Sequence, residues 1–181
     1  MSVHVALLRA VNVGGTGKLP MVELVAMCED AGFTDVRTYI ASGNVVFRSG
    51  LDEAGVRKAL GQRLQAYAGK PVGVLVRSAA EIAAVAAGNP FPHAAGNRVV
   101  ALFVDEALPT DPLTGVTGLR DEQLVLGTRE IFVHYGDGMA DSRLRIPYAQ
   151  QGTARNLNTV GKLAAMAAAL GQVTSGGRGR R

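Results

Sequence analysis

The sequence is poor in cysteine and in aromatic residues. It has one cysteine, no tryptophan, and only 5% aromatic residues in 181. Cys28 has no partner for an internal disulfide, so we expect the protein in a reducing compartment, the cytoplasm. No apolar run approaches the ~20 residues that span a bilayer. The first residues, MSVHVALL, lack the basic segment and cleavage site of a signal peptide and predict a strand instead.

Catalytic and metal-binding motifs are also missing. The histidines His4, His93 and His134 do not have the spacing of metal ligands. The acidic pairs 105–106 and 121–122 would face opposite sides of a strand, which disfavours a shared carboxylate mechanism. No serine lies in a nucleophile elbow. We therefore predict neither a metal nor a cofactor and assign no catalytic residue.

The positive charge is concentrated at the C-terminus. The chain has 19 Lys and Arg against 15 Asp and Glu, a formal charge of +4. Three of those arginines, Arg178, Arg180 and Arg181, lie in a glycine-rich end, and the rest of the chain carries about +1. We expect this basic tail, residues 172–181, to be disordered, either simply solvated or in weak contact with phosphates. A high isoelectric point alone does not indicate nucleic-acid binding here.

The first 77 residues read as strand, helix, hairpin, helix, strand. Apolar residues recur at helical spacing after Pro20, and two β-rich runs flank residues 41–44. Asp52 can cap the second helix, and residues 71–77 predict a strand. This order is typical of the ferredoxin-like, βαββαβ-type arrangement.

Residues 78–171 repeat the order less regularly. We predict helices over 78–88, 111–118, 141–144 and 156–170, and strands over 98–104, 123–126 and 131–135. The expected fold is α+β. It comprises two ferredoxin-like halves, 1–77 and 78–171, packed as one compact body with antiparallel sheets and helices on one face.

A glycine-rich stretch, LLRAVNVGGTGKLP, follows the first strand. Its glycines do not match the spacing of a phosphate-binding loop, and Lys18 is not followed by Ser or Thr, so an NTPase is not indicated. The loop can still present Arg9, Asn12 and Lys18 to an anion, or it can be a plain connection.

Two other short motifs have structural explanations. Ser42 and Asn44 at the hairpin tip are turn formers, although we keep both among the candidate anion ligands. The NPFP segment predicts a helix stop followed by extended chain, with Phe91 in the core.

The most unusual stretch is GTARNLNTVGKL, residues 152–163. An apolar stripe that includes Leu157 and Val160 predicts a buried helix face. Thr153 or Asn156 can cap the helix. Cations near a helix N-terminus oppose its dipole, so a negative partner is expected, either an internal carboxylate or an anionic ligand. The candidate ligands here are Arg155, Asn156, Asn158, Thr159 and Lys162, joined by Ser142 and Arg143.

Several segments resemble the bacterial family called domain of unknown function 1697. They are ALLRAVNVGGTGKLPM, AGFTDVRTYIASGNVVF, NPFP, YGDGMADSRL and TARNLNTVGKLAAM, in order along the chain. The resemblance implies an α+β structure with ferredoxin-like subdomains and no established activity. The family pattern has Trp where this chain has Leu157, which argues against a base-stacking platform at that position.

Three classes of function are open. The first is binding of a phosphate-bearing ligand, a nucleotide or nucleic acid, at the polar residues above. Aromatic residues for reading single strands are scarce, since most aromatics of the predicted strands should be buried, which favours a small anion. The others are an enzyme acting on a phosphorylated molecule and a purely structural or interaction protein. We predict no membrane partner and no particular oligomeric state.

Overall fold

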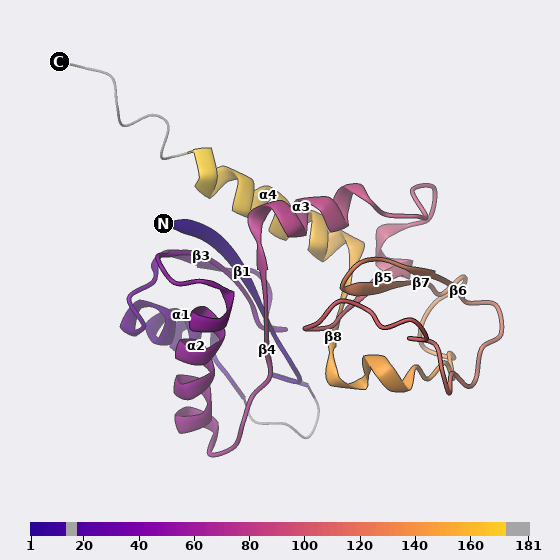
Figure 1. The fold of residues 1–181 in the computed structure, drawn as a ribbon, viewed down its shortest axis with the longest axis horizontal. Helices are drawn as coiled ribbons and strands as arrows, with labels where there is room; N and C mark the ends of the chain where they lie inside the picture. Colours follow the sequence, from indigo (N-terminus) through magenta and orange to yellow (C-terminus); the bar gives the residue numbers. More distant parts are fainter. Residues whose placement is uncertain (14–17, 173–181) are drawn as a thin grey trace. The chain divides into compact units, whose positions relative to one another are not determined.

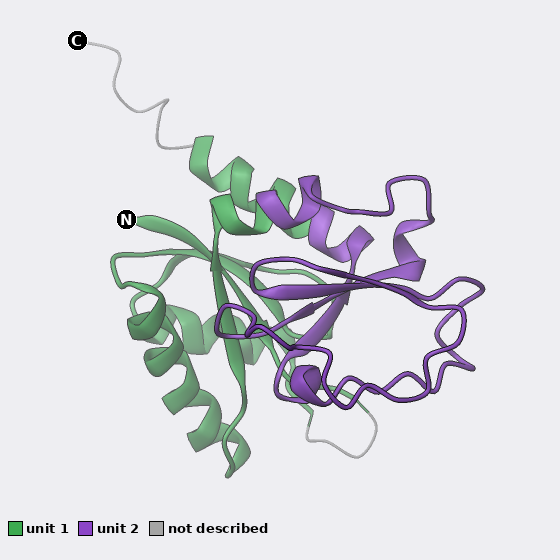
Figure 2. Cartoon of the chain, turned by 45° about the vertical axis from the view of Figure 1, so that its right-hand side comes forward, with its two compact units in different colours: residues 1–83, 162–181 green, residues 84–161 purple. Residues whose placement is uncertain are grey.

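The computed structural model describes residues 1–13 and 18–172. The chain divides into two compact units, with Met1–Ala83 and Lys162–Arg181 in unit 1 and Ala84–Gly161 in unit 2 (Figure 2). The predicted boundary after residue 77 thus precedes the boundary between the units. The predicted disorder of the tail concerns residues outside the described part, except Gln172.

Unit 1 contains an antiparallel sheet of four strands in the order β2-β3-β1-β4 (Figure 1). Its elements are β1 (Ser2–Leu8), α1 (Met21–Asp30), β2 (Thr34–Thr38), β3 (Asn44–Ser49), α2 (Glu53–Ala68) and β4 (Val74–Ser78). The predicted order of strand, helix, hairpin, helix, strand is therefore observed.

Local sequence signals set the helix ends in unit 1. Helix α1 starts directly after Pro20, whose fixed φ suits a helix start. The Asp52 side chain caps α2 by accepting a hydrogen bond from the Gly55 backbone at 2.8 Å. The same helix ends at Gly69, which adopts the left-handed conformation with φ 72°.

The core of unit 1 lies between one face of the sheet and helices α1 and α2. Alternate residues of the strands, such as Leu8 and Phe47, pack there against residues such as Leu24 and Leu60. Arg48 follows Phe47 and therefore faces the other side, where its guanidinium donates to the carbonyl of Leu170. Leu170 belongs to α4 (Leu157–Gln172), so helices lie on both faces of this sheet. The prediction of helices on one face only was wrong here.

Unit 2 contains a second antiparallel sheet, with strands in the order β6-β7-β5-β8. The elements of unit 2 are a short 3-10 helix (Gly96–Arg98), β5 (Val99–Phe103), β6 (Gln123–Leu126), β7 (Glu130–His134), a second 3-10 helix (Pro147–Gln151) and β8 (Thr153–Asn156). Helix α3 (Ala79–Ala87) and helix α4 each continue across a boundary between the units. The strand order matches that of unit 1, as the predicted repetition implies.

Two predicted short helices do not form. Residues 111–118 make successive turns, with Thr114 donating to Asp111 and Val116 to Leu113. Gly115 and Gly118 have positive φ angles of 78° and 72°, which interrupt a helix. Residues 141–144 are also turn and loop. The α+β class is confirmed, with two antiparallel sheets and four α-helices in residues 1–13 and 18–172, while the ferredoxin-like description of the halves stays a prediction.

No helix within the described residues has the length and apolar composition to cross a membrane.

Candidate functional site

The first loop of unit 1 is held closed by Asn12. Its amide nitrogen donates to the carbonyls of Leu19 and Ala41, each at 2.8 Å, and its oxygen accepts from the Leu19 backbone at 2.7 Å. The Asn12 side chain thus joins Leu19 to Ala41 of the β2–β3 hairpin. Asn12, a predicted anion ligand, uses its side chain in these internal bonds.

Three non-glycine residues in this region have left-handed backbones. Ala10 and Asn12 have φ of 55°, and Ile40 in the hairpin has φ of 51°. Asparagine tolerates this region, but for alanine and especially β-branched isoleucine it costs on the order of 1 kcal/mol or more. Such strain persists only where surrounding contacts enforce it, and it is often found at binding sites.

The hairpin tip packs tightly against the end of β1. Gly43 has φ of 88°, and a Cβ there would lie 2.6 Å from Val11 Cγ2, so only glycine fits. The buried Asn44 donates to the Tyr39 carbonyl and to Ser42 Oγ, each at 2.9 Å. Ser42 and Asn44, also predicted anion ligands, therefore fix the turn.

A pocket of about 370 Å³ opens beside this loop in unit 1. Its lining is mostly apolar, with Tyr67 and two lysines, Lys18 and Lys70, as its polar members. The nine described residues that line it include no Asp or Glu; they are Ala10, Val11, Lys18, Leu19, Leu64, Tyr67, Ala68, Lys70 and Val72. The pocket thus combines an apolar floor with two positive charges.

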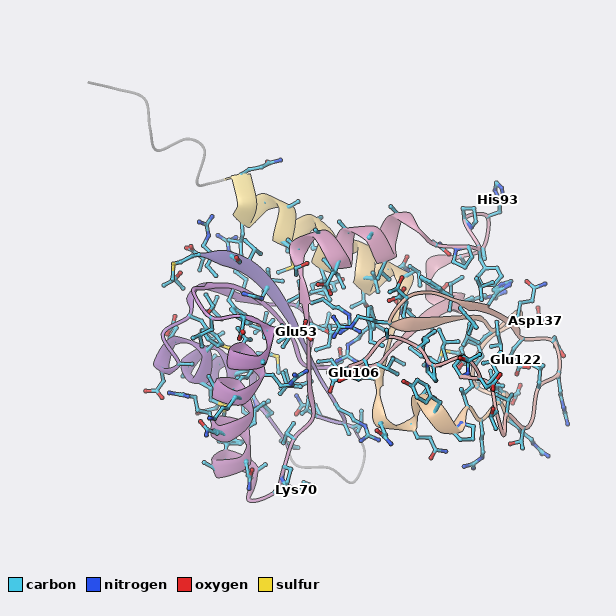
Figure 3. All side chains as sticks on the ribbon, in the orientation of Figure 1. Glu53, Lys70, His93, Glu106, Glu122 and Asp137 are labelled. Atoms are coloured by element: carbon cyan, nitrogen blue, oxygen red, sulfur yellow. The ribbon has the colours of Figure 1, made fainter. Side chains whose placement is uncertain are left out.

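Only Lys18 of the predicted site residues lines this pocket. Arg9 is exposed and comes directly before the lining residue Ala10, and its side chain lies against Gly73. Sequence reasoning missed Tyr67, in the last turn of α2, and Lys70, which lies between α2 and β4 (Figure 3 labels Lys70). Since β4 pairs with β1, the strand pairing alone could have placed this segment near the first loop.

The predicted cluster in residues 152–163 is divided between a strand and a helix. Arg155 belongs to β8, where it pairs with Ala101 of β5. The prediction that Arg155 lies at the first helical turn was therefore wrong. Its side chain is buried and donates to Thr153 Oγ1 at 2.7 Å and to the Ala154 carbonyl at 2.9 Å. Burial lowers the pKa of Arg155 to about 10. Internal oxygens thus already accept from this guanidinium.

The other members of that cluster differ in exposure. Asn156 Oδ1 accepts from the Thr159 backbone at 2.9 Å, which confirms Asn156 as the helix cap. Thr159 is buried, whereas Asn158 and Lys162 are exposed.

Ser142 has an internal partner in unit 2. Its hydroxyl donates to Glu122 Oε1 at 2.5 Å, and this bond is the largest cause that lowers the pKa of Glu122. Arg143 is exposed. Across the described part of the chain, no three His, Cys, Asp or Glu side chains are placed to hold a metal ion.

The predicted burial of strand aromatics is largely confirmed. Phe47, Phe103 and Phe132 are buried, and Tyr39 and Tyr135 are half-buried. Phe91, by contrast, is half-buried beside a surface cleft of unit 2 and not a core residue, because the NPFP segment folds into a turn.

Comparisons with known proteins agree with these observations. The chain is similar to the structure of the conserved bacterial protein SP0830 from Streptococcus pneumoniae, with a TM-score of 0.74 and 24% identity over 92% of this chain and 98% of that one. None of the curated proteins compared with the chain matches it. The model of a protein family of unknown function, DUF1697, matches residues 1–132, a range that includes the first loop, the hairpin and NPFP. The chain belongs to the DUF1697 family.

Proposed function

We propose that unit 1 binds a small phosphate-bearing molecule whose body is apolar or aromatic, such as a nucleotide, in the pocket beside the first loop. The observation that carries this proposal is the presence of Lys18 and Lys70 in an apolar pocket whose described lining has no acidic residue. The two ammonium groups would hold the phosphate, and the apolar floor would take the body of the ligand.

The size and rigidity of the pocket support this proposal. Its volume of about 370 Å³ falls in the usual range for small-molecule sites, roughly 300–1,000 Å³. Asn12 ties the loop that carries Lys18, so part of the ordering cost of binding is already met in the free protein. The strained backbone at Ala10, a lining residue, is consistent with a site kept in shape for a ligand.

A small ligand suits this pocket better than a nucleic-acid strand. Proteins that bind single strands through a sheet stack bases on exposed strand aromatics, and Phe47, Phe103 and Phe132 are buried. An enzymatic and a purely structural role stay as the alternatives.

A thermal-shift series tests the proposal. The probes are inorganic phosphate, phenyl phosphate, adenosine monophosphate and, as the uncharged control, phenol. We expect phenyl phosphate and the nucleotide to raise the melting temperature more than phosphate or phenol does, because both parts of the pocket are then used.

Charge variants locate the binding. Lys18→Ala and Lys70→Ala should each lower the affinity for phenyl phosphate by about fivefold to tenfold. Lys58→Ala is the matched control, since Lys58 is exposed on α2 and does not line the pocket. Equal shifts in all variants, or no shift with any phosphate probe, would refute a phosphate site here.

A further inference from the structure

Unit 2 contains a separate cleft of about 600 Å³ at one end of its sheet. It is lined by the NPFP turn, by Arg98 before β5, by the start of β6 and the end of β7, and by the turn after β7. The proposed phosphate site uses none of these residues. From the sequence, NPFP was expected only to stop a helix and to place Phe91 in the core.

The walls of the cleft are fixed by internal contacts. Asn89 Oδ1 accepts from the Phe91 backbone at 2.9 Å, and Ala94 donates to Phe91, which closes the turn. The Phe91 ring lies 5.3 Å from the ring of His134, at an angle of 36°. His134 ends β7, an inner strand of the sheet, so the Phe91 ring packs against a residue anchored in the sheet.

Two residues of opposite charge, Arg98 and Asp137, line the cleft. Arg98 Nη1 donates to the carbonyl of Gly136, the residue before Asp137, at 3.2 Å. Both side chains are exposed, both belong to the described part of the chain, and no ion pair joins them. Gln123, paired with His134 in the sheet, adds an amide to the same cleft.

We propose that this cleft binds a purine base, with guanine as the best match. Guanine presents two adjacent N–H donors, N1 and N2, which a carboxylate such as Asp137 can accept. Its O6 and N7 acceptors suit a guanidinium such as Arg98. The base face stacks on Phe91, as bases do on aromatic side chains in nucleic-acid-binding proteins.

The other charged and polar groups are compatible with this orientation. His93 lies on an exposed loop after α3, and Asp137 is exposed as well (Figure 3 labels both). An imidazole there can donate to a sugar or phosphate oxygen of the ligand. The same base chemistry occurs in free nucleotides and in single strands, so the experiment must separate these sources.

Calorimetric or NMR titration with uncharged nucleosides tests the cleft, because nucleosides carry no phosphate for the lysine pocket. We expect guanosine to bind more tightly than inosine, which lacks N2, and adenosine to bind most weakly. Asp137→Asn should lower guanosine affinity about tenfold while preserving the size of the side chain. Asp111→Asn, exposed in the same unit and outside the cleft, is the control.

Two further variants keep the proposal falsifiable. Phe91→Leu should lower the affinity for every nucleoside about tenfold, since it removes stacking but keeps an apolar side chain. Lys58→Ala, at an exposed position that lines neither pocket, should leave guanosine affinity unchanged. Unchanged guanosine affinity in both Asp137→Asn and Phe91→Leu, equal affinity for the three nucleosides, or no binding at millimolar concentration would overturn the proposal.

A final comparison identifies the source of the base. Guanosine monophosphate and a short thymine strand with one guanine are each titrated into the protein, and their affinities are compared. Tighter, steeply salt-dependent binding of the strand indicates single-stranded nucleic acid, and tighter binding of the monophosphate indicates a free nucleotide. Either result supports the proposed site if Asp137→Asn also weakens the binding of the preferred ligand.

Discussion

Asn12 and Leu19 are joined by two hydrogen bonds that run in opposite directions. The Asn12 amide donates to the Leu19 carbonyl at 2.8 Å, and the Leu19 backbone donates to Asn12 Oδ1 at 2.7 Å. A third bond from the same amide reaches Ala41. One side chain thus closes the first loop and attaches it to the hairpin.

Replacement of Asn12 should destabilise unit 1 and open the loop. Asn12→Ala removes three hydrogen bonds and places alanine at φ 55°, so we expect a loss of about 2–3 kcal/mol in the free energy of unfolding. Asn12→Gly removes the same bonds without the backbone strain and should cost less.

Urea titration measures both variants, with Asn97→Ala, at an exposed position in unit 2, as control. An Asn12→Ala protein as stable as the wild type would show that these bonds do not hold the loop.

Cys28 should be unreactive in the folded protein. Burial, together with the smaller effect of the nearby Glu29, raises the pKa of its thiol to about 12, so almost no thiolate is present at pH 8. We expect a thiol reagent to label Cys28 only after unfolding in urea. The labelling rate should then increase with the urea concentration. Rapid stoichiometric labelling of the native protein would contradict the buried position of this residue.

The stability of the protein should decrease as the pH falls through the range of histidine titration. Burial lowers the pKa of His4 below 6.5, while the Leu51 backbone and the nearby carboxylates of Glu53 and Asp52 oppose that shift. The unfolded chain therefore binds a proton at His4 more readily than the folded chain does. This contribution to stability is intact above pH 6.5 and is lost as the pH falls from 6.5 towards the folded pKa.

Urea midpoints measured between pH 5 and 8 check this expectation against His4→Gln, which cannot titrate. The wild type should lose more stability than His4→Gln at the acidic end. Parallel pH profiles would mean that His4 titrates alike in the folded and unfolded states.

Two cations of the predicted polar cluster in residues 152–163 should differ in their effect on stability, the buried Arg155 and the exposed Lys162. Arg155→Ala should cost about 2 kcal/mol of unfolding free energy, because it empties a buried position and leaves Thr153 without a donor. Lys162→Ala should change stability by less than about 0.5 kcal/mol, since Lys162 is exposed. Thermal or urea unfolding of the two variants gives the comparison, and equal losses would contradict this assignment.

The elements with strong local signals were predicted correctly. Pro20 before α1 and the Asp52 cap of α2 each specify a helix start through local backbone chemistry, so sequence pattern sufficed. The hairpin at residues 41–44 was found for the same reason. Tertiary contacts decided the failure at Arg155: β8 is a strand because Arg155 and its neighbours pair with β5, which no local pattern reveals.

The candidate site could be predicted only in part. Lys18 was identified because it lies in the glycine-rich loop, but Lys70 has no local motif and joins the lining only through the packing of α2 and β4. Asn12, Ser42 and Asn44 were candidate ligands, and Ser42 and Asn44 were also expected turn formers. Their side chains form hydrogen bonds within the protein, and amide and hydroxyl groups give no sequence signal that separates the two roles.

The most direct test of the phosphate pocket is calorimetric titration of phenyl phosphate into the wild type and into the double variant Lys18→Ala/Lys70→Ala. We predict measurable binding to the wild type and to Lys58→Ala, and an affinity reduced at least tenfold in the double variant. Unchanged affinity in a double variant that remains folded would contradict the proposed function.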